Sequence, residues 1–168
     1  MTLHREPPMP FRRPVLNALA GLVAAFGLTQ AALAEGGNSR PRLPLLPSYQ
    51  QECGACHLAY PPGALPAASW QRITADLPHH YGVDASLDPA LRQELSAWLT
   101  ANAGTWKRVG APPPQDRITR SAWFVREHGE VAATTWKLPA VKSAAQCNAC
   151  HTQAEQGDFN ERNVRIPR

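Results

Sequence analysis

All four cysteines of this 168-residue chain lie in two copies of one pentapeptide, and this feature constrains the fold more than any other. The copies read CGACH at residues 53–57 and CNACH at residues 147–151. Each places two thiols three residues apart and a histidine directly after the second thiol; the residues are Cys53, Cys56, His57, Cys147, Cys150 and His151. No cysteine is left over for another role.

Three other kinds of structure use paired cysteines, and the sequence disfavours each of them. Zinc ribbons place their CxxC pairs roughly 15 to 20 residues apart, whereas 90 residues lie between Cys56 and Cys147. A thioredoxin-like dithiol needs alternating strands and helices around one CxxC, and neither copy has them. Two disulfides would leave the histidines unexplained. CxxCH is the attachment signature of c-type haem. We therefore expect two covalently bound haem c groups, with His57 and His151 as iron ligands.

The spacing within the pentapeptide has a mechanical reason. On a helix, positions i, i+3 and i+4 share one face, so both thiols can reach one porphyrin edge while the histidine turns to the iron. An S-x-x-Q capping box precedes each copy, at Ser48 to Gln51 and at Ser143 to Gln146. The sequence therefore predicts that each copy lies near the start of a helix.

The first 34 residues have the layout of a secretory signal peptide. Arginines at positions 5, 12 and 13 precede an apolar run at residues 18–28, and Ala32-Leu33-Ala34 supplies a cleavage site of small residues. The apolar run is much shorter than the roughly 18 residues of a membrane-spanning helix, which disfavours an uncleaved anchor. We expect cleavage after Ala34, export to the periplasm, and no stable membrane insertion of the mature chain.

The second axial ligand of each iron must come from few donors. Both methionines, Met1 and Met9, lie in the leader, so the mature chain has none to offer. The mature histidines outside the two pentapeptides are His79, His80 and His128. Position 80 follows the first motif histidine by 23 residues, and position 128 precedes the second by 23 residues. This symmetry is compatible with one histidine pair in each half of the chain.

We expect His128 and one of the two adjacent histidines to complete the iron sites. His128 lies one helical turn after Phe124, on a face that would otherwise be core. His79 and His80 point in different directions on any regular backbone, so only one of them should bind. Lysines at positions 107, 137 and 142 are less favoured donors. Histidine in place of methionine predicts low reduction potentials.

Outside the pentapeptides, the sequence predicts a mainly α-helical protein with short helices and long proline-rich loops wrapped around two haems. Its 17 prolines are about twice the usual frequency, which leaves little room for long helices. Apolar stripes and caps predict helices at residues 67–77, 89–102, 120–128 and 147–156. Asp88 and Pro89 mark the start of the second helix, Thr119 caps the third, and Gly157 ends the fourth.

These elements are expected to form one domain at residues 48–168. The expected segments are a flexible lead-in at residues 35–47, a first half at 48–103 with the first motif, a connector at 104–116, and a second half at 117–168 with the second motif. The run Pro112 to Pro114 keeps the connector from being helical.

Beyond the pentapeptides, the sequence from Tyr49 to Pro167 resembles the dihaem cytochrome c family. The segments that carry the resemblance are ECGACHLAYPPGALPAASW, LPHHYGVDASL, RITRSAWFVREH and CNACHTQAEQGDFNERNVRIP. The family has a histidine before an aromatic residue and a glycine, which matches His80 rather than His79. Its histidine at the end of the WFVREH segment matches His128. The resemblance implies that these two residues complete two bis-histidine haems.

The resemblance also implies a function. Members of the family are bacterial periplasmic electron-transfer proteins, and some are linked to membrane b-type cytochromes and to an oxygen-binding monohaem cytochrome. We therefore expect an electron carrier that has no catalytic residues and that exchanges electrons with redox partner proteins. The alternative is a peroxidase-like haem enzyme or a gas-binding protein with one open iron site, although the chain has a histidine for each iron.

Charge adds little to the choice of partner. The formal net charge is +4, and the leader accounts for +2 of it, with three arginines against one glutamate. The remaining +2 is too weak to indicate nucleic-acid binding. Four haem propionates and two ferric centres bring the mature protein to about zero, so strong electrostatic steering is not expected.

Overall fold

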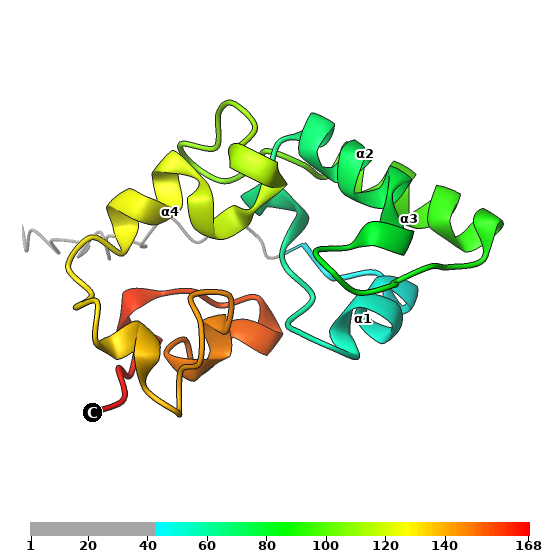
Figure 1. Ribbon diagram of the computed structural model, residues 1–168. Helices are drawn as coiled ribbons and strands as arrows, with labels where there is room; N and C mark the ends of the chain where they lie inside the picture. The colour runs from blue at the N-terminus through cyan, green and yellow to red at the C-terminus, as the bar shows by residue number, and fades with distance from the viewer. Residues whose placement is uncertain (1–42) are drawn as a thin grey trace, which may run out of the picture. The chain divides into compact units, whose positions relative to one another are not determined.

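A computed structural model describes residues 43–168, in which short helices alternate with long loops (Figure 1). The predicted signal peptide at 1–34 lies outside the described residues, as does most of the predicted lead-in. Within residues 43–168 the regular structure consists of four α-helices and eight short 3-10 turns, and no strand is present. The predicted mainly α-helical fold with short helices and long loops is confirmed.

The first helix, α1, spans Pro47–Gly54 and carries Cys53 in its last turn. Pro47 takes the first helical position, where the N–H that it lacks would have no partner within the helix. Leu46 is the N-cap residue and makes no side-chain bond, so the capping box predicted at Ser48 is wrong. The Ser48 hydroxyl instead donates a hydrogen bond to Glu94 Oε1 at 3.2 Å.

Two helices, α2 (Ala67–Ala75) and α3 (Pro89–Ala101), pack side by side in the first half (Figure 1). The predicted start of α3 is confirmed, because the Asp88 carboxylate accepts hydrogen bonds from the first N–H groups of the helix at 2.9 and 3.3 Å. α2 ends two residues before the predicted end. Leu77 precedes a proline, which disfavours helical geometry, and the 3-10 turn η2 (Leu77–His79) follows.

The main apolar cluster of the described residues belongs to the first half. Its largest members are each at most 5% exposed; they are Tyr49, Leu65, Trp70, Leu95 and Leu99. Burying a large apolar side chain contributes about 1.5 to 3 kcal/mol. The cluster therefore gives α1, α2 and α3 a core made of protein side chains.

The 3-10 turn η1 (Pro62–Ala64) joins the two halves through its backbone carbonyls. Trp70 Nε1 donates to the Pro62 carbonyl at 2.7 Å, and Trp123 Nε1 donates to the Ala64 carbonyl at 3.1 Å. Between them, the Gly63 carbonyl accepts a hydrogen bond from the backbone N–H of Trp106 at 3.2 Å. Three tryptophans from α2, the connector and the second half thus bind one three-residue turn.

The second half has less helix than the sequence predicts. α4 spans Ala122–Glu127, and its cap is Ser121, whose hydroxyl accepts from the Phe124 N–H at 3.3 Å. The cap predicted at Thr119 is wrong, because the 3-10 turn η4 (Ile118–Arg120) precedes α4.

The helix predicted at residues 147–156 is also wrong, and two 3-10 turns, η6 (Cys147–Ala149) and η7 (Ala154–Gln156), stand in its place. The C-terminal tail binds the backbone between these turns. His151 pairs with Val164 in an isolated antiparallel bridge, and the Arg165 N–H donates to the Cys150 carbonyl at 2.8 Å. Gly157 ends η7 with a φ of 71°, as predicted for a residue that closes a helix.

The proline-rich connector is held against α2 rather than left free. Its only regular element is the 3-10 turn η3 (Pro114–Asp116). Arg72 of α2 donates two hydrogen bonds to the Asp116 carboxylate, at 2.8 and 2.6 Å.

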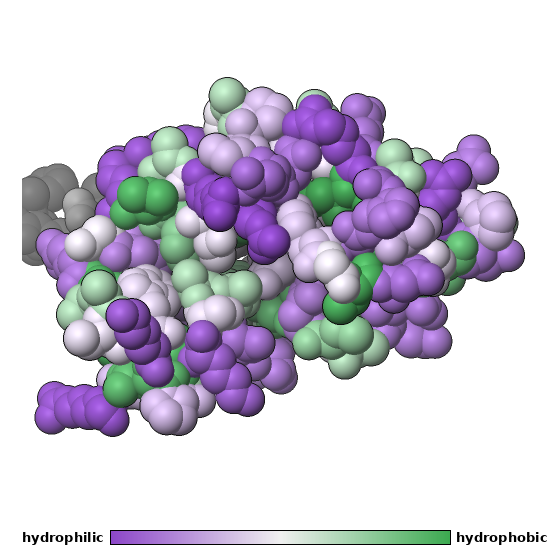
Figure 2. Space-filling view, in the orientation of Figure 1, coloured by the Kyte–Doolittle hydropathy of each residue, from purple (hydrophilic) through white to green (hydrophobic). Residues whose placement is uncertain are grey.

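No helix in the described part of the chain has the length and apolar character to cross a bilayer. On the face shown in Figure 2, hydrophilic residues dominate and hydrophobic residues form small separate patches.

Candidate haem sites

The four motif cysteines are free thiols in the structure, so the two disulfides considered as an alternative are not formed. Burial raises the pKa of Cys53 and of Cys147 to about 11, which keeps both thiols neutral at physiological pH. Among residues 43–168, no group of three or more histidine, cysteine or acidic side chains could hold a metal ion. The two cysteine pairs are therefore not gathered into one cluster of four ligands in the described part of the chain.

The predicted helical presentation of the two motifs is only partly correct. Cys53 lies on α1, but α1 ends at Gly54, so Cys56 and His57 follow the helix. In the second motif, Cys147 begins η6 and His151 lies beyond it. Glycine and asparagine inside the motifs are poor helix formers, and the second motif is also bound by the C-terminal tail.

In the first half, the structure brings His57 and His80 together. Their ring centroids lie 6.1 Å apart, and the ring planes differ by 22°. Two imidazoles bound on opposite sides of one metal, with metal–nitrogen bonds of about 2.0 Å, have ring centroids roughly 6 Å apart. The pair therefore has the spacing that one iron between two axial histidines requires.

Two contacts fix the orientation of the His57 ring. The Nδ1 atom lies 2.7 Å from the Leu58 carbonyl oxygen, which accepts its proton. The ring also stacks on Tyr60, with centroids 4.8 Å apart and planes 19° apart. A histidine that donates from Nδ1 to a carbonyl keeps Nε2 free as the metal-binding nitrogen.

His80 and its neighbour His79 have different surroundings. His80 begins a tight turn with positive φ at Tyr81 (51°) and Gly82 (100°), closed by a hydrogen bond from the Val83 N–H at 3.1 Å. Burial lowers the pKa of His80, and the nearby charges of His57 and Arg117 lower it further, which favours the neutral imidazole. His79 instead has an 80% exposed side chain whose Nδ1 pairs with Asp76 at 2.7 Å. Of the two, only His80 faces the first motif histidine.

In the second half, the structure brings His128 and His151 together. Their ring centroids lie 6.0 Å apart, and the ring planes differ by 72°. The His128 Nδ1 donates to the Phe124 carbonyl at 2.9 Å, so this ring too has a carbonyl partner on Nδ1 and Nε2 free. The Nδ1 of His151 is buried without a hydrogen-bond partner. Burial and the neighbouring His128 lower the pKa of His151, which favours its neutral form.

Aromatic rings surround the second histidine pair, and most of them were not predicted from the sequence. Phe124 stacks on His128 with centroids 4.0 Å apart, and Trp136 lies 6.0 Å from the same ring. Phe159 lies 5.3 Å from His151. These rings come from α4, from the turn η5 (Thr135–Lys137) and from the loop before the tail. Only Phe124 had a sequence signal, its helical spacing to His128.

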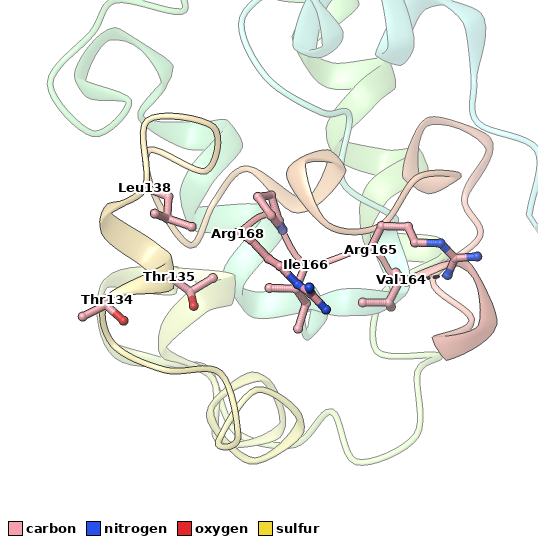
Figure 3. A pocket seen from close by; sticks show the side chains of 8 residues that line it. Thr134, Thr135, Leu138, Val164, Arg165, Ile166 and Arg168 are labelled. Atoms are coloured by element: carbon pink, nitrogen blue, oxygen red, sulfur yellow. Dashed lines mark hydrogen bonds between the residues drawn. The ribbon is translucent and has the colours of Figure 1, made fainter.

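A cavity of about 680 Å³ lies between residues 134–138 and the C-terminal tail (Figure 3). One side consists of Thr134, Thr135 and Leu138, next to Trp136, and the other side is the tail from Val164 to Arg168. Because Val164 pairs with His151, the cavity borders segments that position both histidines. Arg165 and Arg168 bring two cations to its lining.

Comparison with known proteins agrees with this geometry. The family model of dihaem cytochrome c (DHC) matches residues 49–159, and the chain belongs to this family. A diheme cytochrome type c from Shewanella baltica OS155, known from an X-ray structure, is 39% identical with a TM-score of 0.63. The match covers 72% of this chain and 92% of that one.

A DHC crystal structure from Rhodobacter sphaeroides is 43% identical with a TM-score of 0.60, and the match covers 68% of this chain and 96% of that one. A second structure, of a diheme cytochrome c from Rhodobacter sphaeroides, is 38% identical with a TM-score of 0.63. The match covers 71% of this chain and 100% of that one. No curated protein matches the chain.

Membership in the family gives the chain two covalently bound c-type haems with iron. The residues present fit that cofactor. The chain has two pairs of free thiols, each followed by a histidine, and each of these histidines faces a second one at about 6 Å.

Proposed function

We propose that the protein is a periplasmic electron carrier whose two haems each have two histidine ligands. His57 and His80 would hold one iron, and His128 and His151 the other. The observation that carries the proposal is the presence of two histidine pairs whose ring centroids lie 6.1 and 6.0 Å apart, each including one motif histidine. Two occupied axial positions leave no site on the iron for a substrate, so the chain would carry electrons and not catalyse a reaction.

The haems would supply one-electron chemistry, and the chain would supply attachment, orientation and shielding. Cys53 and Cys56 would attach the first haem, and Cys147 and Cys150 the second. The backbone carbonyls that accept from the Nδ1 atoms of two histidines make these rings better donors to iron. Two histidine ligands favour a lower potential than a histidine and a methionine.

Cations near the second pair would bind the propionates of that haem. Arg165 and Arg168 line the 680 Å³ cavity, and guanidinium groups pair well with carboxylates. In the structure, Arg165 donates to the carbonyls of Arg162 and Val164 at 3.1 and 2.7 Å. These are weaker partners than a carboxylate, so the side chain could exchange them for a propionate.

Export by a cleaved signal peptide at 1–34 would deliver the chain to the periplasm, where haem would be attached to the two cysteine pairs. Redox proteins would be its partners, among them a membrane b-type cytochrome and an oxygen-binding monohaem cytochrome. The small separate hydrophobic patches on the face shown in Figure 2 and the low net charge suit brief encounters better than a permanent complex.

The spin state of the irons tests this proposal. We expect the ferric holoprotein to contain two low-spin haems, and we expect the reduced protein not to bind added carbon monoxide. A high-spin haem that binds carbon monoxide would contradict the carrier and favour the peroxidase-like or gas-binding alternative.

The two adjacent histidines provide a matched pair of variants. His80→Ala should convert one haem to a high-spin form that binds carbon monoxide, because its ring faces His57 at 6.1 Å. His79→Ala should leave both haems low-spin, because that side chain is exposed and paired with Asp76. Optical and electron paramagnetic resonance spectra of the two variants distinguish the ligands, and the opposite pattern would refute the assignment.

A further inference from the structure

Tyr60 follows the first motif by three residues and contacts the first histidine pair. Its ring stacks on His57 with centroids 4.8 Å apart and planes only 19° apart. Contact with His57 places the phenol ring beside a residue that would hold the first iron. The position of this ring is therefore coupled to the orientation of His57.

The hydroxyl of the same residue reaches the second motif. Tyr60 Oη donates a hydrogen bond to the Ala145 carbonyl at 2.9 Å, across 85 residues of sequence. Cys147 Sγ lies 3.8 Å from that same carbonyl oxygen. One side chain thus connects a histidine that would hold the first iron with the Ala145 carbonyl, which lies beside a cysteine sulfur of the second motif.

The backbone of Tyr60 is anchored from the core. The hydroxyl of Tyr49, which is 2% exposed, donates to the Tyr60 carbonyl at 2.7 Å. Tyr60 itself is partly buried. Its position is therefore fixed at the backbone, at the ring and at the hydroxyl.

We propose that Tyr60 is the bridge along which electrons pass between the two haem sites. The inference rests on the proposed function, because it needs two iron sites that exchange electrons. One electron leaves the reduced site and arrives at the oxidised site, and no bond forms or breaks. Tyr60 remains a neutral phenol and acts by filling the gap between the two sites with a ring and a hydrogen bond.

Tyr81 provides a matched control in the same part of the protein. Its ring contacts His80 with centroids 4.8 Å apart, and its hydroxyl donates to a backbone carbonyl at 3.0 Å. That carbonyl belongs to Gln115 in the connector and not to the second motif. Tyr81 therefore also contacts a histidine of the first pair and bonds a backbone carbonyl, but its ring meets His80 edge-on at 62° and it lacks the link to the second site.

The experiment compares Tyr60→Phe, Tyr60→Leu and Tyr81→Phe as holoproteins. Pulse reduction of the fully oxidised protein, followed optically, measures the rate at which an electron redistributes between the haems. Redox titration measures both midpoint potentials in the same samples. We expect a several-fold slower redistribution in Tyr60→Phe, a larger loss in Tyr60→Leu, and the wild-type rate in Tyr81→Phe, with midpoint potentials unchanged in both phenylalanine variants.

The outcomes separate this inference from the proposed function. If the wild type lacks two low-spin haems, the proposed function fails. If the wild type has them and Tyr60→Phe redistributes electrons at the wild-type rate, the bridge is refuted while the carrier stands. A slower rate that is accounted for by shifted potentials, or that occurs equally in Tyr81→Phe, also refutes the bridge. Because Tyr60→Phe keeps the ring, the test does not depend on the folding of Tyr60→Leu.

Discussion

Gly63 provides the sharpest test of how the two halves are joined. A Cβ at this position would overlap Thr105 Oγ1 and would lie 2.6 Å from Trp106 Cδ1, both far inside van der Waals contact. Trp106 cannot easily move away, since its ring lies against Trp123 and Phe159 at centroid distances of 5.4 and 5.3 Å. Gly63→Ala must therefore separate η1 from the connector or displace an aromatic ring.

Overpacking of this kind costs about 1 to 3 kcal/mol of unfolding free energy. With a urea m value of about 2 kcal/mol/M, a loss of 2 kcal/mol lowers the unfolding midpoint by roughly 1 M. The assay is urea unfolding of the holoprotein, followed by tryptophan fluorescence and by haem absorbance. Both probes should report the change, because the affected tryptophans lie between the core of the first half and the second histidine pair.

Gly110→Ala is the matched control for this substitution. A Cβ at Gly110 would meet nothing within 4 Å, and its φ lies outside the positive range that favours glycine. This variant should unfold within about 0.5 kcal/mol of the wild type. Equal midpoints for Gly63→Ala and Gly110→Ala would show that the close approach at η1 does not hold the halves together.

Two further predictions concern charge and ligand orientation. Hydrogen bonding from Arg72 lowers the pKa of Asp116 below its ordinary value of 3.8, so the stabilisation is present above that pH and is lost as the pH falls through the lowered pKa. Asp116→Asn should remove this part of the acid sensitivity, and acid unfolding curves that match the wild type would contradict it. The ring planes of the two histidine pairs differ by 22° and 72°. Electron paramagnetic resonance of the ferric protein should show one rhombic low-spin signal and one highly anisotropic signal, because crossed rings leave the iron d orbitals closer in energy; two identical signals would contradict the angles.

The sequence predicted the parts of the structure that depend on local chemistry. Asp88 and Pro89 began α3 as expected, because a carboxylate cap and a proline act within one helical turn. The two motifs, the shortage of methionine and the family resemblance together led to the same four histidines that the structure pairs. Whether these histidines bind iron remains a prediction.

Features that depend on distant contacts could not be predicted from the sequence. The hydrogen bond from Tyr60 to Ala145 spans 85 residues, and no local sequence pattern indicates it. The second motif does not form its predicted helix, because the tail at Val164 and Arg165 binds its backbone. The capping box at Ser48 failed for a local reason, since Pro47 already begins the helix one residue earlier.

The two halves differ in how much protein core they possess. The apolar cluster lies between residues 49 and 99, whereas the buried apolar residues from 117 onward are only Phe124, Val141 and Ala154 among the described residues. With so few buried apolar side chains of its own, the second half has much less protein core than the first. Its order should therefore depend more strongly on the haem attached to its cysteines.

Removal of each haem by substitution of its cysteines tests this asymmetry. In Cys147→Ala/Cys150→Ala, amide hydrogen exchange should lose protection across residues 129–168, while α2 and α3 stay protected by their own apolar cluster. The reciprocal variant Cys53→Ala/Cys56→Ala is the control and should keep part of the protection in α2 and α3, because that cluster remains. Full protection of residues 129–168 without the second haem would show that protein contacts alone order the second half, since the aromatic rings around His128 and His151 would then suffice as its core.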